Sequence, residues 1–135
     1  MRLVPAIVVI FLAVAVIVFA WVINPYWGTP FDKNDWAKAL SCAGKSDLAC
    51  VAHEQSCPRG RMIFSIRRFH LRVGMSSASV TGLLGDGRST IAGVSSGRCM
   101  AWPLGMCSGL GMDYDFLVAC FDDQSRLTET FLRQS

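Results

Sequence analysis

A chain of 135 residues is long enough for one domain and one appendage. Its formal net charge of +3 is too small to indicate a nucleic-acid-binding protein. The hydrophobic fraction of 52% lies at the upper edge of the globular range, and much of it is concentrated at the N-terminus.

Residues 3–23 are apolar and uncharged. A helix of this length rises about 30 Å, which matches the hydrocarbon core of a bilayer. A signal peptide cleaved after Ala20 is the alternative, but Trp21 to Ile23 continue the apolar run past that site. We therefore predict residues 1–23 to be a transmembrane anchor or uncleaved signal. Arg2 precedes the run and no basic excess follows it, so the N-terminus is expected in the cytoplasm.

All six cysteines follow the apolar run, and an even number outside the cytoplasm indicates disulfides. Zinc is disfavoured because none of them form a closely spaced C-x-x-C pair. Three precede residue 60 and three follow residue 98, so full pairing requires at least one bridge between the two groups. The candidates are Cys42, Cys50, Cys57, Cys99, Cys107 and Cys120.

The segment after the apolar run is expected to be a linker followed by a short helical region. Residues 24–31 are rich in Pro and Gly and are predicted to be the linker. Residues 32–60 form a cysteine-containing helical extension, with Asn34 and Ser46 as candidate helix caps.

Residues 61–71 have helical spacing, which predicts Met62, Ile66 and Phe69 on one face. Five arginines in this helix and on either side of it could be a solvated face, or could meet an acidic partner or anionic head groups. They are Arg59, Arg61, Arg67, Arg68 and Arg72.

A second helix is predicted to begin after Ser76, a favourable N-cap residue. Met75 and Val80 would form a hydrophobic staple across its first turn. Gly85 is expected to end the helix with a positive φ.

The remainder predicts three strands. Residues 99–104 contain Pro103, which is restricted to a sheet edge or a strand end. The continuous apolar run of residues 114–121 indicates the central strand. Residues 126–132 alternate, and this places Leu127, Glu129 and Phe131 on one face and Thr128, Thr130 and Leu132 on the other.

The ordered combination of these features resembles the SmpA/OmlA (BamE-like) domain family over about residues 61–133. The resemblance implies two helices packed on a three-stranded antiparallel sheet in the bacterial envelope, with functions in protein–protein contacts. Its relatives reach a membrane through a lipid, whereas this chain is predicted to use a helix. The residues that carry it are Gly74, Met75, Ser76, Val80, Leu84, Gly85, Trp102, Leu117, Phe121, Asp122 and Leu127.

The sequence thus predicts an α+β protein with an N-terminal transmembrane helix, the extension, and an ααβββ domain over residues 61–135. We expect a single-pass inner-membrane protein whose C-terminal domain is periplasmic; secretion to the periplasm after cleavage is the alternative. The expected function is non-catalytic binding or scaffolding of an envelope protein. The alternative is an immunity or inhibitor protein that neutralises an exported toxin or enzyme.

No catalytic residues, metal, cofactor, nucleic acid or small-molecule ligand are expected. His53 and His70 have no partners at a spacing typical of metal or catalytic sites. Met100, Met106 and Met112 could hold copper(I), but filling gaps in a packed loop is favoured.

Overall fold

The computed structural model describes residues 3–23, 28–89, 98–109 and 111–135. The predicted linker over residues 24–31 lies partly outside these ranges. The described elements, in chain order, are α1 (Leu3–Ile23), α2 (Lys33–Lys38), α3 (Asp47–Gln55), η1 (Gly60–Met62), α4 (Ile63–Ser65), η2 (Ile66–His70), α5 (Ser77–Leu84), β1 (Cys99–Gly105), β2 (Asp115–Phe121) and β3 (Leu127–Gln134).

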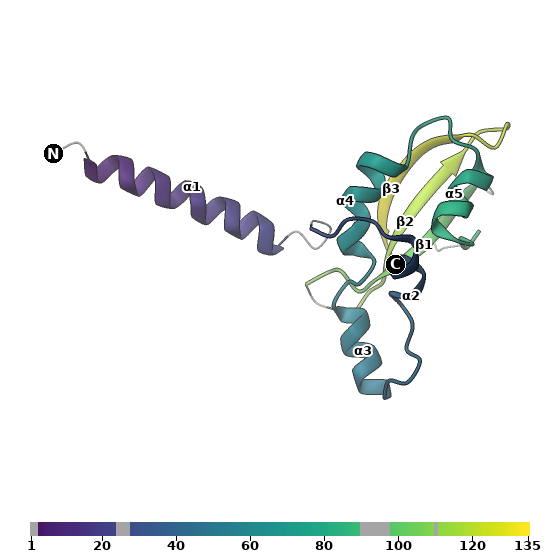
Figure 1. The fold of residues 1–135 in the computed structure, drawn as a ribbon, viewed down its shortest axis with the longest axis horizontal. Helices are drawn as coiled ribbons and strands as arrows, with labels where there is room; N and C mark the ends of the chain where they lie inside the picture. Colours follow the sequence, from purple (N-terminus) through teal and green to yellow (C-terminus); the bar gives the residue numbers. More distant parts are fainter. Residues whose placement is uncertain (1–2, 24–27, 90–97, 110) are drawn as a thin grey trace.

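Helix α1 stands apart from the other elements in Figure 1. Its side chains at residues 7–20 are exposed, with Phe11 at 77% and Phe19 at 66%. In the part of the chain that the structure describes, no helix has both the length and the apolar character that a membrane crossing requires. The transmembrane helix predicted over residues 3–23 is therefore not confirmed.

The three strands form an antiparallel sheet in the order β1-β2-β3, which confirms the predicted α+β architecture. β2 is central and buries Phe116 to Ala119, which alternate between the two core clusters on opposite faces of the sheet. Pro103 lies in β1, where a missing N–H at the sheet edge is tolerated.

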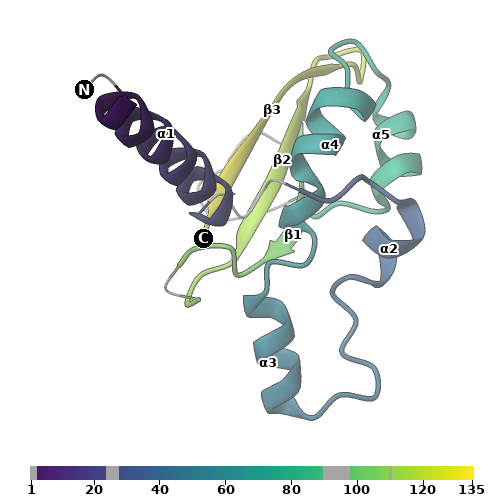
Figure 2. The same cartoon turned by 60° about the vertical axis from the view of Figure 1, so that its left-hand side comes forward.

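The main core lies between one face of the sheet and the helices α4, η2 and α5, which Figures 1 and 2 show on the same side. The predicted extension contributes Trp36, which is 1% exposed. Its indole Nε1 donates to the Leu84 carbonyl at 2.8 Å, and Trp102 Nε1 donates to the Gly85 carbonyl at 2.9 Å. Two indoles from separate elements thus satisfy carbonyls at the C-terminal end of α5, which a helix alone leaves without partners.

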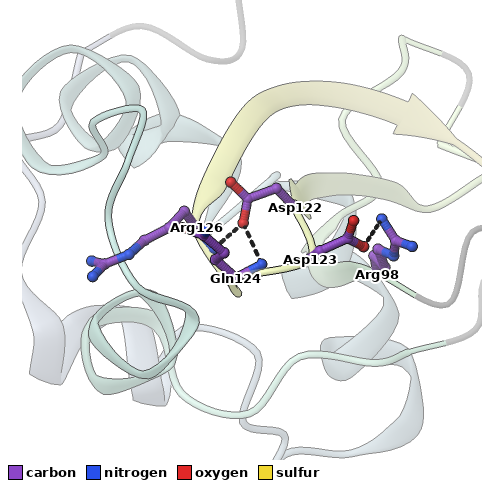
Figure 3. A network of polar contacts seen from close by, with 5 residues as sticks. All are labelled: Arg98, Asp122, Asp123, Gln124 and Arg126. Atoms are coloured by element: carbon purple, nitrogen blue, oxygen red, sulfur yellow. Dashed lines mark hydrogen bonds and ion pairs between the residues drawn. The ribbon is translucent and has the colours of Figure 1, made fainter.

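The turn between β2 and β3 is built on Asp122 (Figure 3). Its Oδ1 accepts the backbone N–H groups of Gln124 at 2.9 Å and Arg126 at 2.8 Å. This is the turn-forming use of a short acidic side chain. Beside it, Arg98 and Asp123 form an exposed ion pair, which contributes little in water.

The prediction that Phe69 shares one face with Met62 and Ile66 was wrong, because those two are buried and Phe69 is 62% exposed. The Leu71 N–H donates to the Ile66 carbonyl at 2.9 Å, so η2 is a π-helical turn with one extra residue. The wider turn brings Leu71, 7% exposed, to the inner position that α-helical spacing assigned to Phe69.

The prediction that Leu127 and Phe131 share a face of β3 was also wrong. Cys120 pairs with Glu129 but Phe121 pairs with Leu127, so β3 carries one extra residue at this point. A β-bulge of this kind reverses the alternation of faces. Leu127 and Leu132 consequently pack in the main core, whereas Phe131 packs on the opposite face of the sheet.

The two predicted caps of the extension had different outcomes. Asp32, not Asn34, caps α2: its side chain accepts from the N–H groups of Asn34 and Asp35. Ser46 caps α3 as predicted.

Candidate functional site

All six cysteines are paired, as predicted, in the bridges Cys42–Cys50, Cys57–Cys107 and Cys99–Cys120. The required bridge between the two groups is Cys57–Cys107, which joins the extension to the loop after β1. Both of its cysteines are buried, whereas Cys42 and Cys50 are partly exposed.

The Cys57–Cys107 bridge is reinforced by close backbone contacts. The Met106 N–H donates to the Glu54 carbonyl at 2.9 Å, and the Arg59 N–H donates to the Leu104 carbonyl at 3.1 Å. Gly105 has φ +106°, and a Cβ there would lie 2.8 Å from the Glu54 carbonyl oxygen. Glycine therefore allows the extension and the end of β1 to approach this closely.

The predicted motif residues occupy structural positions. Ser76 caps α5 by accepting the Ser79 N–H at 3.1 Å, and its hydroxyl also contacts that of Ser79. Gly74 and Gly85 have φ of +90° and +80° on either side of α5. The apolar members gather in the main core: Met75, Val80, Leu84, Trp102, Leu117, Phe121 and Leu127.

A groove of 530 Å³ lies between the α4–η2 helical segment and β3, and we call it the η2–β3 groove. Its helical wall consists of Ile63, Phe64, Arg67, Arg68, Leu71 and the following Val73. Its strand wall consists of Leu127, Glu129, Thr130 and Leu132. The groove thus combines a buried apolar base with charged groups at its rim, which is typical of a binding site.

The rim of the groove exposes large apolar side chains. Phe64 is 46% exposed and Val73 is 78% exposed. Phe69 lies nearby, since its ring centroid is 6.4 Å from that of Phe64. An exposed apolar patch flanking a groove is typical of surfaces that contact other molecules.

The same segment is strongly basic. Residues 55–85 contain five arginines and no acidic residue. Arg67 and Arg68 are exposed and line the groove, where Glu129 is the acidic group. The rim therefore favours a ligand that carries negative charge.

A second cavity of 540 Å³ contains Glu54, Arg59, Arg88 and Tyr114. Arg59 lies over the Trp36 ring at 4.6 Å and donates from Nε to the Trp36 carbonyl at 2.8 Å. Burial lowers the pKa of Arg59. Because its guanidinium already binds the protein, Arg59 has the position of a structural cross-link between the extension and the core.

Tyr114 in this cavity has a perturbed phenol. Burial, followed by a hydrogen bond with Glu54, raises the pKa of Tyr114 to about 12. Both effects favour the neutral phenol. A group that stays protonated to this pH is not a general base near neutrality.

The remaining polar candidates lie apart from the groove. His53 Nε2 contacts the Ala39 carbonyl, and the His70 ring lies 4.9 Å from that of Phe31. Met100 packs against the core, whereas Met112 is 72% exposed.

Ligand atoms of Cys42, Cys50 and Glu54 lie within 4.8 Å of one another. The two sulfurs are bonded to each other, and a disulfide sulfur is not the thiolate that a metal requires.

The groove was not predicted from the sequence, although its basic residues were noted. The available signal was the coincidence of arginines with Phe64 and Phe69 in one acid-free segment. The other wall comes from β3, more than 50 residues further along the chain, and no local pattern connects the two.

No family model, curated protein or solved structure matches this chain.

Proposed function

We propose that this chain is a non-catalytic binding domain of the bacterial envelope that holds a partner protein in the η2–β3 groove. The observation that carries the proposal is the groove itself, with its apolar base, exposed aromatic rim and two exposed arginines, Arg67 and Arg68. The resemblance to the SmpA/OmlA family supports the same type of function.

Attachment to a membrane through residues 3–23 is part of the proposal and rests on the apolar sequence of that segment. The exposed side chains of residues 7–20 support it, because they pack against no other part of the described chain. With this orientation the disulfide-bonded part lies in the periplasm, where disulfides persist.

Site-specific photocrosslinking in native cells tests the proposal. A benzoylphenylalanine at Phe64, on the groove rim, should give a discrete crosslinked product with an envelope protein. The matched control is the same probe at Leu48, which is 84% exposed on α3 and outside the groove. Absence of any product from position 64 would refute the groove as a binding site.

An inhibitor or immunity function is the second candidate, and α3 favours it. This helix extends away from the sheet in Figures 1 and 2, buries none of its residues and exposes Leu48 and Val51. The Cys42–Cys50 bridge restrains the loop that leads into it, and a rigid exposed projection suits insertion into an enzyme cleft. In this case the probe at Leu48 would capture the target, and deletion of the chain would sensitise the cell to a toxin.

A further inference from the structure

β3 is an outer strand of the described sheet, and its outer edge lies along the η2–β3 groove. The Ser135 N–H donates to the Tyr114 carbonyl at 3.0 Å, one step beyond the Asp115–Gln134 pair in the register. Hydrogen-bonded and non-hydrogen-bonded pairs alternate along an antiparallel ladder. Phe131 and Arg133 therefore bond to β2, whereas Thr130, Leu132 and Gln134 direct their N–H and C=O groups outward.

A side-chain contact agrees with this assignment. Arg67 Nη2 donates to the Thr130 carbonyl at 3.2 Å from the helical wall of the groove. That carbonyl accordingly faces the groove. An arginine here satisfies an edge acceptor that would otherwise bond to water or to another strand.

The start of β3 is already paired and so sets the limit of the open edge. The Gly74 N–H donates to the Leu127 carbonyl and the Leu127 N–H donates to the Met75 carbonyl, both at 2.7 Å. Beyond Leu127 the edge lines the groove as far as Leu132, and the strand continues to Gln134. This length accommodates an added strand of about six residues, or about 20 Å.

We infer that the η2–β3 groove binds an extended segment of the partner protein as a fourth strand on β3. Alternate apolar side chains of that segment would contact the groove base between Ile63 and Leu132, and a carboxylate side chain would meet Arg67 and Arg68. The inference rests on the proposed function, because it specifies how the same groove recognises its partner.

Binding would exchange hydrogen bonds without losing them. A backbone N–H of the incoming segment replaces the Arg67 guanidinium on the Thr130 carbonyl. Arg67 then turns to the carboxylate, and a charge-assisted bond of this kind is stronger than its bond to a neutral carbonyl. Residues 55–85 carry five arginines and no acidic residue, and this positive charge selects an acidic segment over a basic one.

The test uses the full chain in nonionic detergent and a fluorescein-labelled hexapeptide of alternating valine and glutamate, followed by fluorescence anisotropy. Three matched peptides serve as controls: one replaces glutamate by lysine, and two carry N-methyl groups on alternate amides, at the odd or at the even positions. We expect the lysine peptide, and the N-methylated peptide whose blocked amides face β3, to bind at least about tenfold more weakly than the parent peptide. If both N-methylated peptides bind as well as the parent peptide, strand addition is overturned; if the lysine peptide does, carboxylate recognition is overturned.

Protein variants provide the second arm. Thr130→Pro removes an outward N–H that β2 does not use, so the sheet should persist while peptide affinity falls about tenfold. Arg67→Ala with Arg68→Ala should weaken binding similarly. Arg61→Ala with Arg72→Ala is the matched control, because it removes the same charge outside the groove and should leave affinity unchanged. A folded Thr130→Pro variant that binds like the original chain would overturn the inference; if that variant unfolds, the N-methylated peptides decide.

The peptide and crosslinking results together separate this inference from the proposed function. Failure of every peptide to bind, with a persistent crosslink from position 64, refutes strand addition and leaves the partner-binding function intact; loss of both refutes both. If no peptide binds but phosphatidylglycerol vesicles do, in a way that requires Arg67 and Arg68, the groove is a lipid-contact surface and the inference is wrong.

Discussion

Replacing Cys57 and Cys107 together by alanine removes the disulfide between the extension and the sheet. The bridge spans 50 residues, so the chain-entropy model predicts a loss of about 4 kcal/mol of unfolding free energy. The same calculation gives about 3.3 kcal/mol for the 21-residue span of Cys99–Cys120. It gives about 2.5 kcal/mol for the 8-residue span of Cys42–Cys50.

Guanidinium unfolding of the full chain in nonionic detergent measures these losses. Trp36 and Trp102 are both 1% exposed, so their fluorescence reports exposure of the core. The three double alanine variants should rank in the order of the loop lengths, with Cys57–Cys107 the most destabilised. Burial of Cys57 and Cys107 adds to their loss, because alanine leaves part of their volume empty. A larger loss from removing Cys42–Cys50 than from removing Cys57–Cys107 would refute the loop-entropy reasoning.

Three further predictions concern single residues. Ser76→Ala should lower the unfolding free energy by about 1 kcal/mol, because the Ser79 N–H loses its cap, and Ser77→Ala should lower it less in the same denaturation assay. Gly105→Ala should cost about 2 kcal/mol or more, since φ is +106° and the new Cβ would meet the Glu54 carbonyl at 2.8 Å; Gly109→Ala, which has open space, is the control, and equal melting temperatures would contradict the argument. Tyr114 should make stability pH-dependent in alkali. Its folded pKa of about 12 lies above the ordinary 10.0, so its contribution is fully present below pH 10 and is lost as pH rises through about 12; Tyr114→Phe should flatten that part of the stability profile.

The sheet could be predicted because its signals are local. A continuous apolar run, an edge proline and an Asp122 turn each specify a strand position without knowledge of distant contacts. The ends of α5 are likewise set locally. Ser76 caps a backbone N–H only three residues away, and Gly85 ends the helix with a positive φ.

The predicted faces of Phe69 and Phe131 were wrong because the backbone there departs from regular helical or strand periodicity. The π turn at Ile66–His70 and the bulge opposite Phe121 each insert one residue, and both shifts are selected by packing rather than by a local motif. Both insertions lie next to the η2–β3 groove. Each insertion turns side chains toward the groove or away from it. The same two irregularities that sequence periodicity did not predict therefore shape the candidate site.

The first hydrogen bonds after α1 limit how far from a membrane the groove can meet a partner. The Thr29 N–H donates to the Arg61 carbonyl at 3.1 Å, and the Phe31 N–H donates to Ser65 Oγ at 3.0 Å. The chain is thus bonded to η1 and α4, beside the helical wall of the groove, six residues after Ile23, a contour length of about 20 Å at most. If residues 3–23 are embedded in a bilayer, this short linker keeps the groove close to the membrane surface. It would sample segments that emerge near the bilayer at a high effective concentration, and it could not reach domains that stand far above it.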